Sequence, residues 1–199
     1  MIYEDNDGII ELPAPKLEGL HQIENAGIAI RALKNLQVKE TVLTQCLQNV
    51  NWPARLQKLS TGPMATQVKI LSYDVELWID GGHNQAAARA LVPFLNQPFN
   101  GTSHIILGML NSKDLESFIS EISSFVESIG CISIPESSAA LSAEAVFLTT
   151  KKFHSNTFIA KSLSIALDNI INQNTLKSDV RILFCGSLYL CGYILRNHK

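Results

Sequence analysis

The fold is indicated by the stretch VELWIDGGHN, residues 75–84. Its first half, Val75–Ile79, is apolar enough for a buried strand. Its second half, Asp80–Asn84, is a polar turn in which two adjacent glycines permit close backbone approach. A helical pattern rich in alanine and leucine follows over His83–Leu95. A strand that passes through a glycine turn into a helix is typical of a parallel sheet covered by helices.

Working outward from this stretch, strand and helix patterns alternate from Trp52 to the last residues. We predict strands over Leu56–Ser60, Val75–Ile79, Ser103–Leu107, Cys131–Ile134 and Val180–Phe184. We predict helices over His83–Leu95, Lys113–Ile129, Ala140–Lys152, Asn156–Ile171 and Ser187–Arg196. The stretch Ser60–Ser72 contains Gly62-Pro63 and is expected to form a loop or hairpin. This alternation predicts an α/β fold, with a mostly parallel sheet and helices on both faces.

The first 50 residues have a different pattern. Two short apolar runs, Ile2–Tyr3 and Ile9–Leu12, flank the turn Asn6–Gly8, whose Asp-Gly pair suits a tight hairpin. Two helices are expected next, over Gly19–Leu36 and Lys39–Val50. A hairpin and two helices cannot bury both faces of that hairpin by themselves. We therefore expect residues 1–50 to be the tail of a larger domain that begins before Met1.

Composition excludes several classes of protein. The 199 residues are 46% hydrophobic and 17% charged, a balance that can bury a sizeable core. The net charge is -2 and no basic stripe occurs, so we expect no nucleic-acid partner. No apolar run approaches the roughly 20 residues that span a bilayer, and Met1–Gly8 is too polar for a secretory signal. The four cysteines lack zinc-like spacing, so we predict no metal site and expect free thiols in a reducing cytoplasm.

Three turns follow expected strands, and ligands of such sheets bind at the carboxyl ends of strands. They are Ile79–Asn84, Leu107–Asp114 and Phe184–Ser187. Asp80 could accept hydrogen bonds from ribose hydroxyls or orient a cation, whereas the structural alternative is that Asp80, Asn84 and Ser187 cap helices. The nucleotide fingerprints GxxxxGK[ST] and GxGxxG are both missing, as is the GxSxG hydrolase elbow.

Five segments, in order along nearly the whole chain, resemble the folylpolyglutamate synthase/dihydrofolate synthase family of the Mur ligase superfamily. They are LEGLHQIENA (17–26), NWPARL (51–56), DGGHN (80–84), GMLNSKD (108–114) and LFCGSLYL (183–190). Two departures are small: Ala54 stands where the family usually has glycine, and Gly82 where alanine is common. Neither departure changes a polar contact group.

The resemblance implies a two-domain, ATP-dependent ligase. Residues 1–50 would be the tail of the central ATPase domain, and residues 51–199 the Rossmann-like carboxyl-terminal glutamate ligase domain. The enzyme would add L-glutamate to dihydropteroate or a (tetrahydro)folate through an acyl phosphate, in the cytoplasm. The phosphate loop and the Mg²⁺ ligands would lie in the missing amino-terminal domain, so this chain alone is expected to be inactive.

The resemblance also implies roles for individual residues. Asn25 would bind the adenine edge of ATP, Arg55 its phosphates and Asp80 its ribose. His83 and Ser187 would lie near the incoming glutamate or the acyl phosphate, as catalytic groups. The purely structural alternatives are a polar helix residue for Asn25, a surface ion pair for Arg55 and a hydrogen-bonding turn residue for His83.

Two other functions remain open from the sequence. One is a stand-alone α/β nucleotide-binding or regulatory module. The other is a different amino-acid ligase of the same superfamily, such as one that builds cell-wall peptides. The segments around His21-Gln22 and Gly186–Tyr189 are of the folate type, which disfavours a cell-wall ligase.

Overall fold

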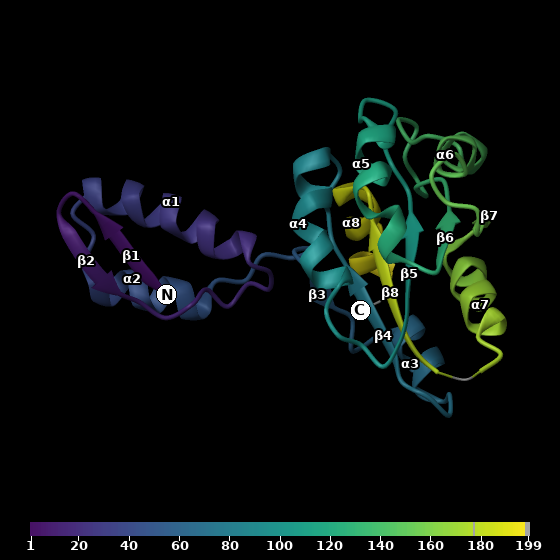
Figure 1. Ribbon diagram of the computed structural model, residues 1–199, viewed down its shortest axis with the longest axis horizontal. Coiled ribbons are helices and arrows are strands. Elements are labelled where there is room, and N and C mark those ends of the chain that lie inside the picture. Colours follow the sequence, from purple (N-terminus) through teal and green to yellow (C-terminus); the bar gives the residue numbers. More distant parts are fainter. Residues whose placement is uncertain (177, 198–199) are drawn as a thin grey trace. The chain divides into compact units, whose positions relative to one another are not determined.

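The computed structural model describes residues 1–176 and 178–197. These form two compact units, Met1–Pro53 and Ala54–Lys199, which are described separately below (Figure 1). No helix within the described residues is both long enough and apolar enough to cross a membrane.

The first unit is an antiparallel hairpin packed against two helices. The hairpin consists of β1 (Ile2–Asp5) and β2 (Gly8–Glu11), and the helices are α1 (His21–Asn35) and α2 (Glu40–Asn49). Its small core contains Tyr3, Leu12, Ala26, Ile30, Leu43 and Leu47. The predicted hairpin and both predicted helices are confirmed.

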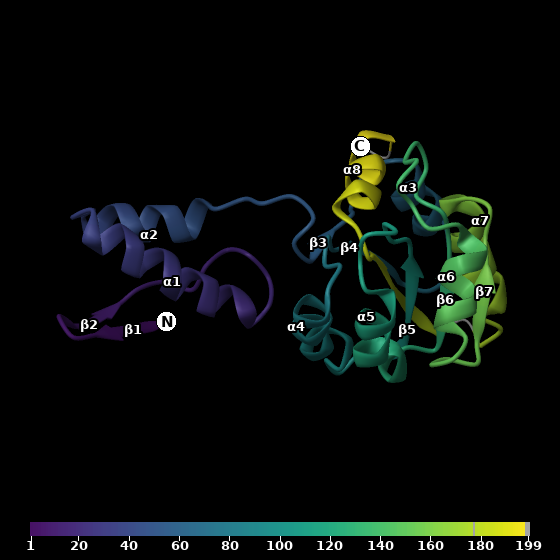
Figure 2. The ribbon, with the colours of Figure 1, turned by 90° about the horizontal axis from the view of Figure 1, so that it is seen from above.

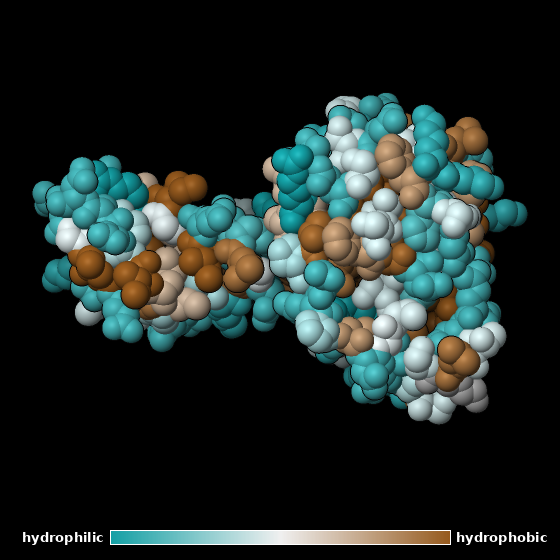
Figure 3. All heavy atoms as spheres, in the orientation of Figure 1, coloured by the Kyte–Doolittle hydropathy of each residue, from teal (hydrophilic) through white to brown (hydrophobic). Residues whose placement is uncertain are grey.

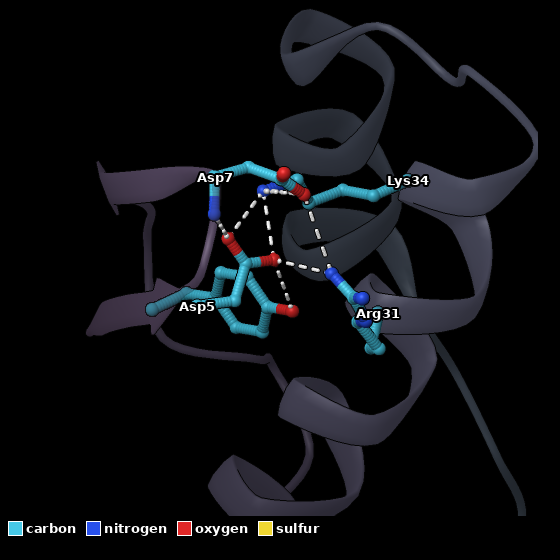
Figure 4. Close-up of polar contacts among 5 residues, drawn as sticks. Asp5, Asp7, Arg31 and Lys34 are labelled. Carbon is cyan, nitrogen blue, oxygen red and sulfur yellow. Dashed lines mark hydrogen bonds and ion pairs between the residues drawn. The ribbon is translucent and has the colours of Figure 1, made fainter.

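A charge cluster ties the hairpin to α1 (Figure 4). Asp5 accepts hydrogen bonds from Lys34 Nζ at 2.8 Å and from Arg31 Nη1 at 3.0 Å. Its Oδ2 also accepts from the hydroxyl of Tyr3 at 2.9 Å. The hydrogen bond from Lys34 is the main reason that the pKa of Asp5 lies well below its usual range. The cluster holds an acidic hairpin turn against a basic stretch of helix.

Several large apolar side chains of the first unit are exposed. Ile2 is 74% exposed, Ile9 66%, Leu20 69% and Ile28 73%. Hydrophobic side chains, brown in Figure 3, are visible over this unit. Exposed apolar area of this kind is typical of a surface that another part of a protein covers.

The second unit is built on a six-stranded sheet in the order β3-β4-β8-β5-β6-β7. The strands are β3 (Gln57–Lys58), β4 (Val75–Ile79), β5 (Gly101–Leu107), β6 (Ser128–Cys131), β7 (Thr157–Ile159) and β8 (Asp179–Cys185). Only β3 runs antiparallel to its neighbour, whereas the other pairs are parallel. The predicted mostly parallel α/β sheet is confirmed.

Helices cover both faces of this sheet (Figure 2). They are α3 (Pro63–Lys69), α4 (Gln85–Leu95), α5 (Leu115–Ile122), α6 (Ala143–Thr150), α7 (Leu163–Gln173) and α8 (Leu188–Asn197), with a 3₁₀ turn at Ser123–Phe125. One core cluster joins the sheet to α4, α5 and α6, through Leu91, Phe118 and Val146. The other joins it to α3, α7 and α8, through Met64, Leu167 and Ile194. The helix that follows β8 therefore packs on the face opposite to the helices that follow β4 and β5.

Two predicted elements around β6 were wrong at their boundaries. The helix expected over Lys113–Ile129 ends at Ile122, and the strand expected over Cys131–Ile134 is β6, Ser128–Cys131. The apolar residues Phe118, Ile122, Phe125 and Ile129 recur every three or four positions, which lets the helical pattern extend into the strand. Backbone pairing of β6 with β5, from His104–Ser128 to Leu107–Cys131, decides the register.

Two other segments were assigned to the wrong class. The helix expected over Asn156–Ile171 contains edge strand β7, and α7 begins only at Leu163, because Ser162 Oγ caps it by accepting from Ile165 N at 3.2 Å. The loop expected over Ser60–Ser72 contains α3, in which Pro63 occupies the first turn. Proline is favourable there because its missing N–H would be unpaired in any case.

Candidate functional site

The site is built where the carboxyl ends of β4, β8 and β5 meet. Backbone hydrogen bonds join the segments that leave these neighbouring strands. Asp80 N donates to Phe184 O at 3.0 Å, and Gly186 N donates to Gly82 O at 3.0 Å. Gly108 N donates to Cys185 O at 3.2 Å. The three turns predicted from the sequence therefore lie side by side, at the point where helices leave toward opposite faces of the sheet.

Glycine at position 186 allows this close approach. Gly186 has φ +101°, a conformation that side chains disfavour, and a Cβ on it would lie 2.7 Å from the carbonyl oxygen of Gly108. The backbones after β8 and β5 therefore approach as closely as they do because residue 186 has no side chain.

Asp80 is the buried centre of the site. It is 4% exposed, and each of its carboxylate oxygens accepts a backbone hydrogen bond. Oδ2 accepts from Leu56 N at 2.9 Å and Oδ1 accepts from Gly82 N at 2.7 Å. The alternative that Asp80 caps α4 is wrong, since Asn84 Oδ1 fills that role by accepting from Ala87 N at 2.9 Å. Asp80 instead joins the loop before β3 to the turn after β4.

Arg55 lies on that loop, between two buried residues. Ala54 is 3% exposed and Leu56 is 2% exposed, whereas Arg55 is exposed. Ala54 and Leu56 both have left-handed backbones, with φ of 60° and 43°. Arg55 forms no ion pair with any residue in the described part of the chain, so the surface ion pair considered above is not what holds it. Its guanidinium is left available for an anion.

His83 is half-buried on the turn after β4. Its Nδ1 lies 2.9 Å from the carbonyl oxygen of Gly81. Because a carbonyl can only accept, Nδ1 must carry a proton. In the neutral ring Nε2 then has a free lone pair, and it bonds to no described residue. This nitrogen can accept a proton or a hydrogen bond from a ligand.

Ser187 is buried at the start of α8. It is 2% exposed, and its Oγ accepts a hydrogen bond from Tyr189 N at 3.1 Å. The helix-cap role weighed for Ser187 in the sequence is therefore present. The hydroxyl proton is still available for donation, since a serine hydroxyl both accepts and donates.

Asn25 belongs to the first unit, where it is exposed on α1. Its Nδ2 donates to Gln22 Oε1 at 3.2 Å. The two amides border a cavity of about 210 Å³ between α1 and α2, which is otherwise lined mainly by aliphatic side chains such as Ala29, Leu33 and Val50. A flat apolar group with a polar edge matches this combination of lining groups.

Neither metal ligation nor thiol chemistry is indicated for the described residues. No group of three or more His, Cys, Asp or Glu side chains among them is arranged to hold a metal ion. All four cysteines are free thiols, and Cys131, Cys185 and Cys191 are buried. Burial raises the pKa of Cys131 and of Cys191 to about 12, and that of Cys185 also rises, so these thiols are protonated at neutral pH.

Gln57 is a residue of this site that sequence reasoning missed. Its Oε1 accepts a hydrogen bond from Ala54 N at 3.0 Å, which closes the loop that carries Arg55. Glutamine in a short strand has no distinctive sequence signature. Its hydrogen bond to Ala54 N depends on the conformation of the loop, which the sequence pattern does not show.

These features define a doubly wound α/β domain with a polar site at its topological switch point. Residues 65–197 match the family model described as "Dihydrofolate synthetase, C-terminal domain", and the chain belongs to that family. The resemblance inferred from the five sequence segments is thereby confirmed.

Individual relatives agree with this assignment. Folylpolyglutamate synthase of Lacticaseibacillus casei is 28% identical over 200 residues, which cover 96% of this chain and 42% of that protein. The chain thus spans less than half the length of this relative. The solved folylpolyglutamate synthase of Mycobacterium tuberculosis, complexed with ADP and AMPPCP, has a TM-score of 0.76 at 20% identity, covering 96% of this chain and 45% of that chain. E. coli FolC in complex with DHPP and ADP has a TM-score of 0.74 at 24% identity, covering 96% and 42%. At these identities the two structures show a shared fold.

Proposed function

We propose that this chain is the carboxyl-terminal part of an ATP-dependent ligase that adds L-glutamate to dihydropteroate or a folate. The observation that carries the proposal is the convergence of Arg55, Asp80, His83 and Ser187 at one edge of the sheet, in a chain of the dihydrofolate synthetase family. Relatives of the same fold were solved with ADP, which supports a nucleotide as one of the proposed ligands.

The reaction we propose proceeds through an acyl phosphate. A carboxylate of the folate or pteroate attacks the γ-phosphate of ATP, and ADP leaves. The amine of glutamate then attacks the acyl carbon, and inorganic phosphate leaves as the amide bond forms. The contribution of a protein to such chemistry is mainly positioning and stabilisation of charge.

The free groups of the site suit this chemistry. The unpaired guanidinium of Arg55 can bind phosphate oxygens with two parallel N–H donors. Nε2 of His83 can accept a proton from the glutamate amine, and the hydroxyl of Ser187 can donate to a carboxylate or to the acyl phosphate. We assign ribose binding to Asp80 and adenine binding to Asn25.

We further propose that this chain does not catalyse the reaction by itself. Its 199 residues contain no phosphate loop, and in the part that the structure describes no group of three or more His, Cys, Asp or Glu side chains is arranged to hold a metal ion. Those groups would come from an amino-terminal ATPase domain, which would also cover the exposed Ile2, Ile9 and Ile28. A cytoplasmic location is part of the same proposal, since buried free thiols suit a reducing compartment.

The test is a chimera in which the matched segment of the Lacticaseibacillus casei relative is replaced by this chain. The chimera should release phosphate when given ATP, glutamate and a folate or dihydropteroate, whereas the isolated chain should release none. Arg55→Gln should raise the KM for ATP by about tenfold or more, the size of a lost charge-assisted bond. His83→Gln should lower kcat and raise the KM for glutamate, with the KM for ATP little changed.

Arg89→Gln is the matched control. Arg89 is also an exposed arginine of the second unit, but it pairs with Glu121 at 2.9 Å, between α4 and α5. Its loss should leave all three kinetic constants unchanged. A chimera that turns over normally with Arg55→Gln and His83→Gln would refute the site. Turnover by the isolated chain would refute the proposed inactivity.

A further inference from the structure

We propose that Gln57 is a positioning residue for Arg55. In this proposal the amide oxygen of Gln57 holds the loop Ala54–Leu56, whose first and last residues have left-handed backbones, in the shape that presents the guanidinium to the phosphates of a nucleotide. The inference rests on the proposed function, because it needs a nucleotide for Arg55 to bind.

The loop has a conformation that its own residues disfavour. Ala54 has φ 60° and Leu56 has φ 43°. Side chains at positive φ crowd the backbone, so such conformations persist only where surrounding contacts hold them. Because two such residues lie on either side of Arg55, contacts from outside the loop must hold this conformation.

Burial explains part of the shape. Ala54 packs into the core cluster that contains Met64, and Leu56 packs into the cluster that contains Leu91. The two residues therefore insert on different sides of the sheet, and the residue between them must point outward. Packing alone holds the two side chains but not the orientation of the peptide groups between them.

Hydrogen bonds hold those peptide groups. Ala54 O accepts from Gly81 N at 2.9 Å, and Leu56 N donates to Asp80 Oδ2 at 2.9 Å. Ala54 N donates to Gln57 Oε1 at 3.0 Å. Of these partners Gln57 is the one that does not belong to the turn after β4. A substitution of Gln57 therefore changes a restraint on the loop and leaves the groups proposed to contact the ligand in place.

The backbone of Gln57 does not depend on its amide. Gln57 pairs with Ile79 through the antiparallel β3–β4 ladder. A substitution that removes the amide oxygen can therefore keep the strand while it leaves the Ala54 N–H without its acceptor. The strained residue then loses one of its restraints, and Arg55 loses its orientation.

The test is the affinity of the full 199-residue chain for ADP, measured by NMR titration. Gln57→Met keeps the length of the side chain and removes the acceptor, so it should weaken ADP binding about tenfold, close to the effect of Arg55→Gln. Gln57→Glu keeps an acceptor oxygen and should stay within about twofold of wild type. In an Arg55→Gln background, Gln57→Met should add no further loss, because Gln57 acts through Arg55.

A purely structural role predicts different results. It would lower the melting temperature in Gln57→Met while ADP affinity stays the same, or it would make the two losses additive in the double variant. Either result would overturn the inference and leave the proposed function intact. If Gln57→Met does not fold, the double variant Ala54→Gly/Gln57→Met replaces it, because glycine accepts positive φ without strain. The ADP affinity of this double variant should reach part of the wild-type value. A wild-type chain that does not bind ADP would overturn this inference, whereas the proposed function is decided separately by the turnover of the chimera, because the phosphate loop would come from another domain.

Discussion

Acid should destabilise the second unit through one buried histidine. His104 on β5 is 5% exposed, and its ring nitrogens lie 2.8 Å from Ser128 Oγ and 2.9 Å from Thr102 Oγ1. Hydroxyls can both donate and accept, so these partners satisfy a neutral ring. Burial lowers the pKa of His104 from 6.5 to about 4. The folded protein therefore keeps this ring neutral at a pH at which an exposed histidine is charged.

The direction and the size of the effect follow from linkage. Below pH 6.5 the unfolded chain binds a proton at His104 that the folded chain does not bind, so stability falls as the pH decreases. The contribution of neutral His104 to the free energy of unfolding is complete above pH 6.5. It is lost as the pH falls from 6.5 to about 4, and it does not change further below that. At 1.36 kcal/mol per pKa unit, the whole loss is about 3 kcal/mol, of which about 2 kcal/mol is lost by pH 5.

The assay is urea denaturation at pH 7, 6 and 5, followed by the fluorescence of Trp78 in the second unit. The matched control is His104→Gln, which keeps a group that can donate and accept but removes the titration. Wild type should lose about 2 kcal/mol more than His104→Gln between pH 7 and pH 5. The other four histidines of the sequence are present in both proteins, so the difference isolates His104. Equal losses in the two proteins would refute the reasoning.

Two further predictions concern stability. Gly186→Ala should lower the free energy of unfolding by about 2 kcal/mol or more, because the residue has φ +101° and its Cβ would lie 2.7 Å from Gly108 O. The control is Gly192→Ala in α8, where a Cβ meets nothing within 4 Å. In the same denaturation experiment this control should be neutral or stabilising by up to about 1 kcal/mol. Asp5→Asn should reduce hydrogen-exchange protection in the first unit. Wild type should lose the same protection as the pH falls below about 4, because a carboxyl whose folded pKa is lowered by Lys34 stabilises only while it is ionised.

The sequence predicted the elements whose patterns are local. The run Val75–Ile79 was predicted with its observed bounds, because four of its five residues are apolar and it ends at a polar glycine turn. The hairpin around Asp7-Gly8 and the two helices after it were likewise predicted. In each case the signal lies within about a dozen residues, where turn chemistry and hydrophobic periodicity act directly.

The elements that were missed depend on distant partners. Strand β7 has three residues and exists because Ile129–Cys131 offers it a parallel partner. The interpretation of Asp80 shows the same limit in the site. Its residue type and place at a strand end suggested a ligand-binding or capping group, whereas the partner of its Oδ2 is Leu56, 24 residues earlier. No local pattern encodes a bond over that separation.

These long-range bonds also decide which residues can report on binding. Asp80 and Ser187 hold the backbone of the site, so their substitution changes both the loop geometry and any ligand contact. Arg55 and His83 differ, because the guanidinium and Nε2 bond to no described residue. Arg55→Gln leaves every hydrogen bond at the sheet edge in place, whereas His83→Gln also removes the bond from His83 Nδ1 to the carbonyl oxygen of Gly81. A kinetic effect of Arg55→Gln therefore measures contact with a ligand, whereas the same effect at His83 or Asp80 combines contact with positioning. Arg55 is therefore the residue on which the proposed function is best decided.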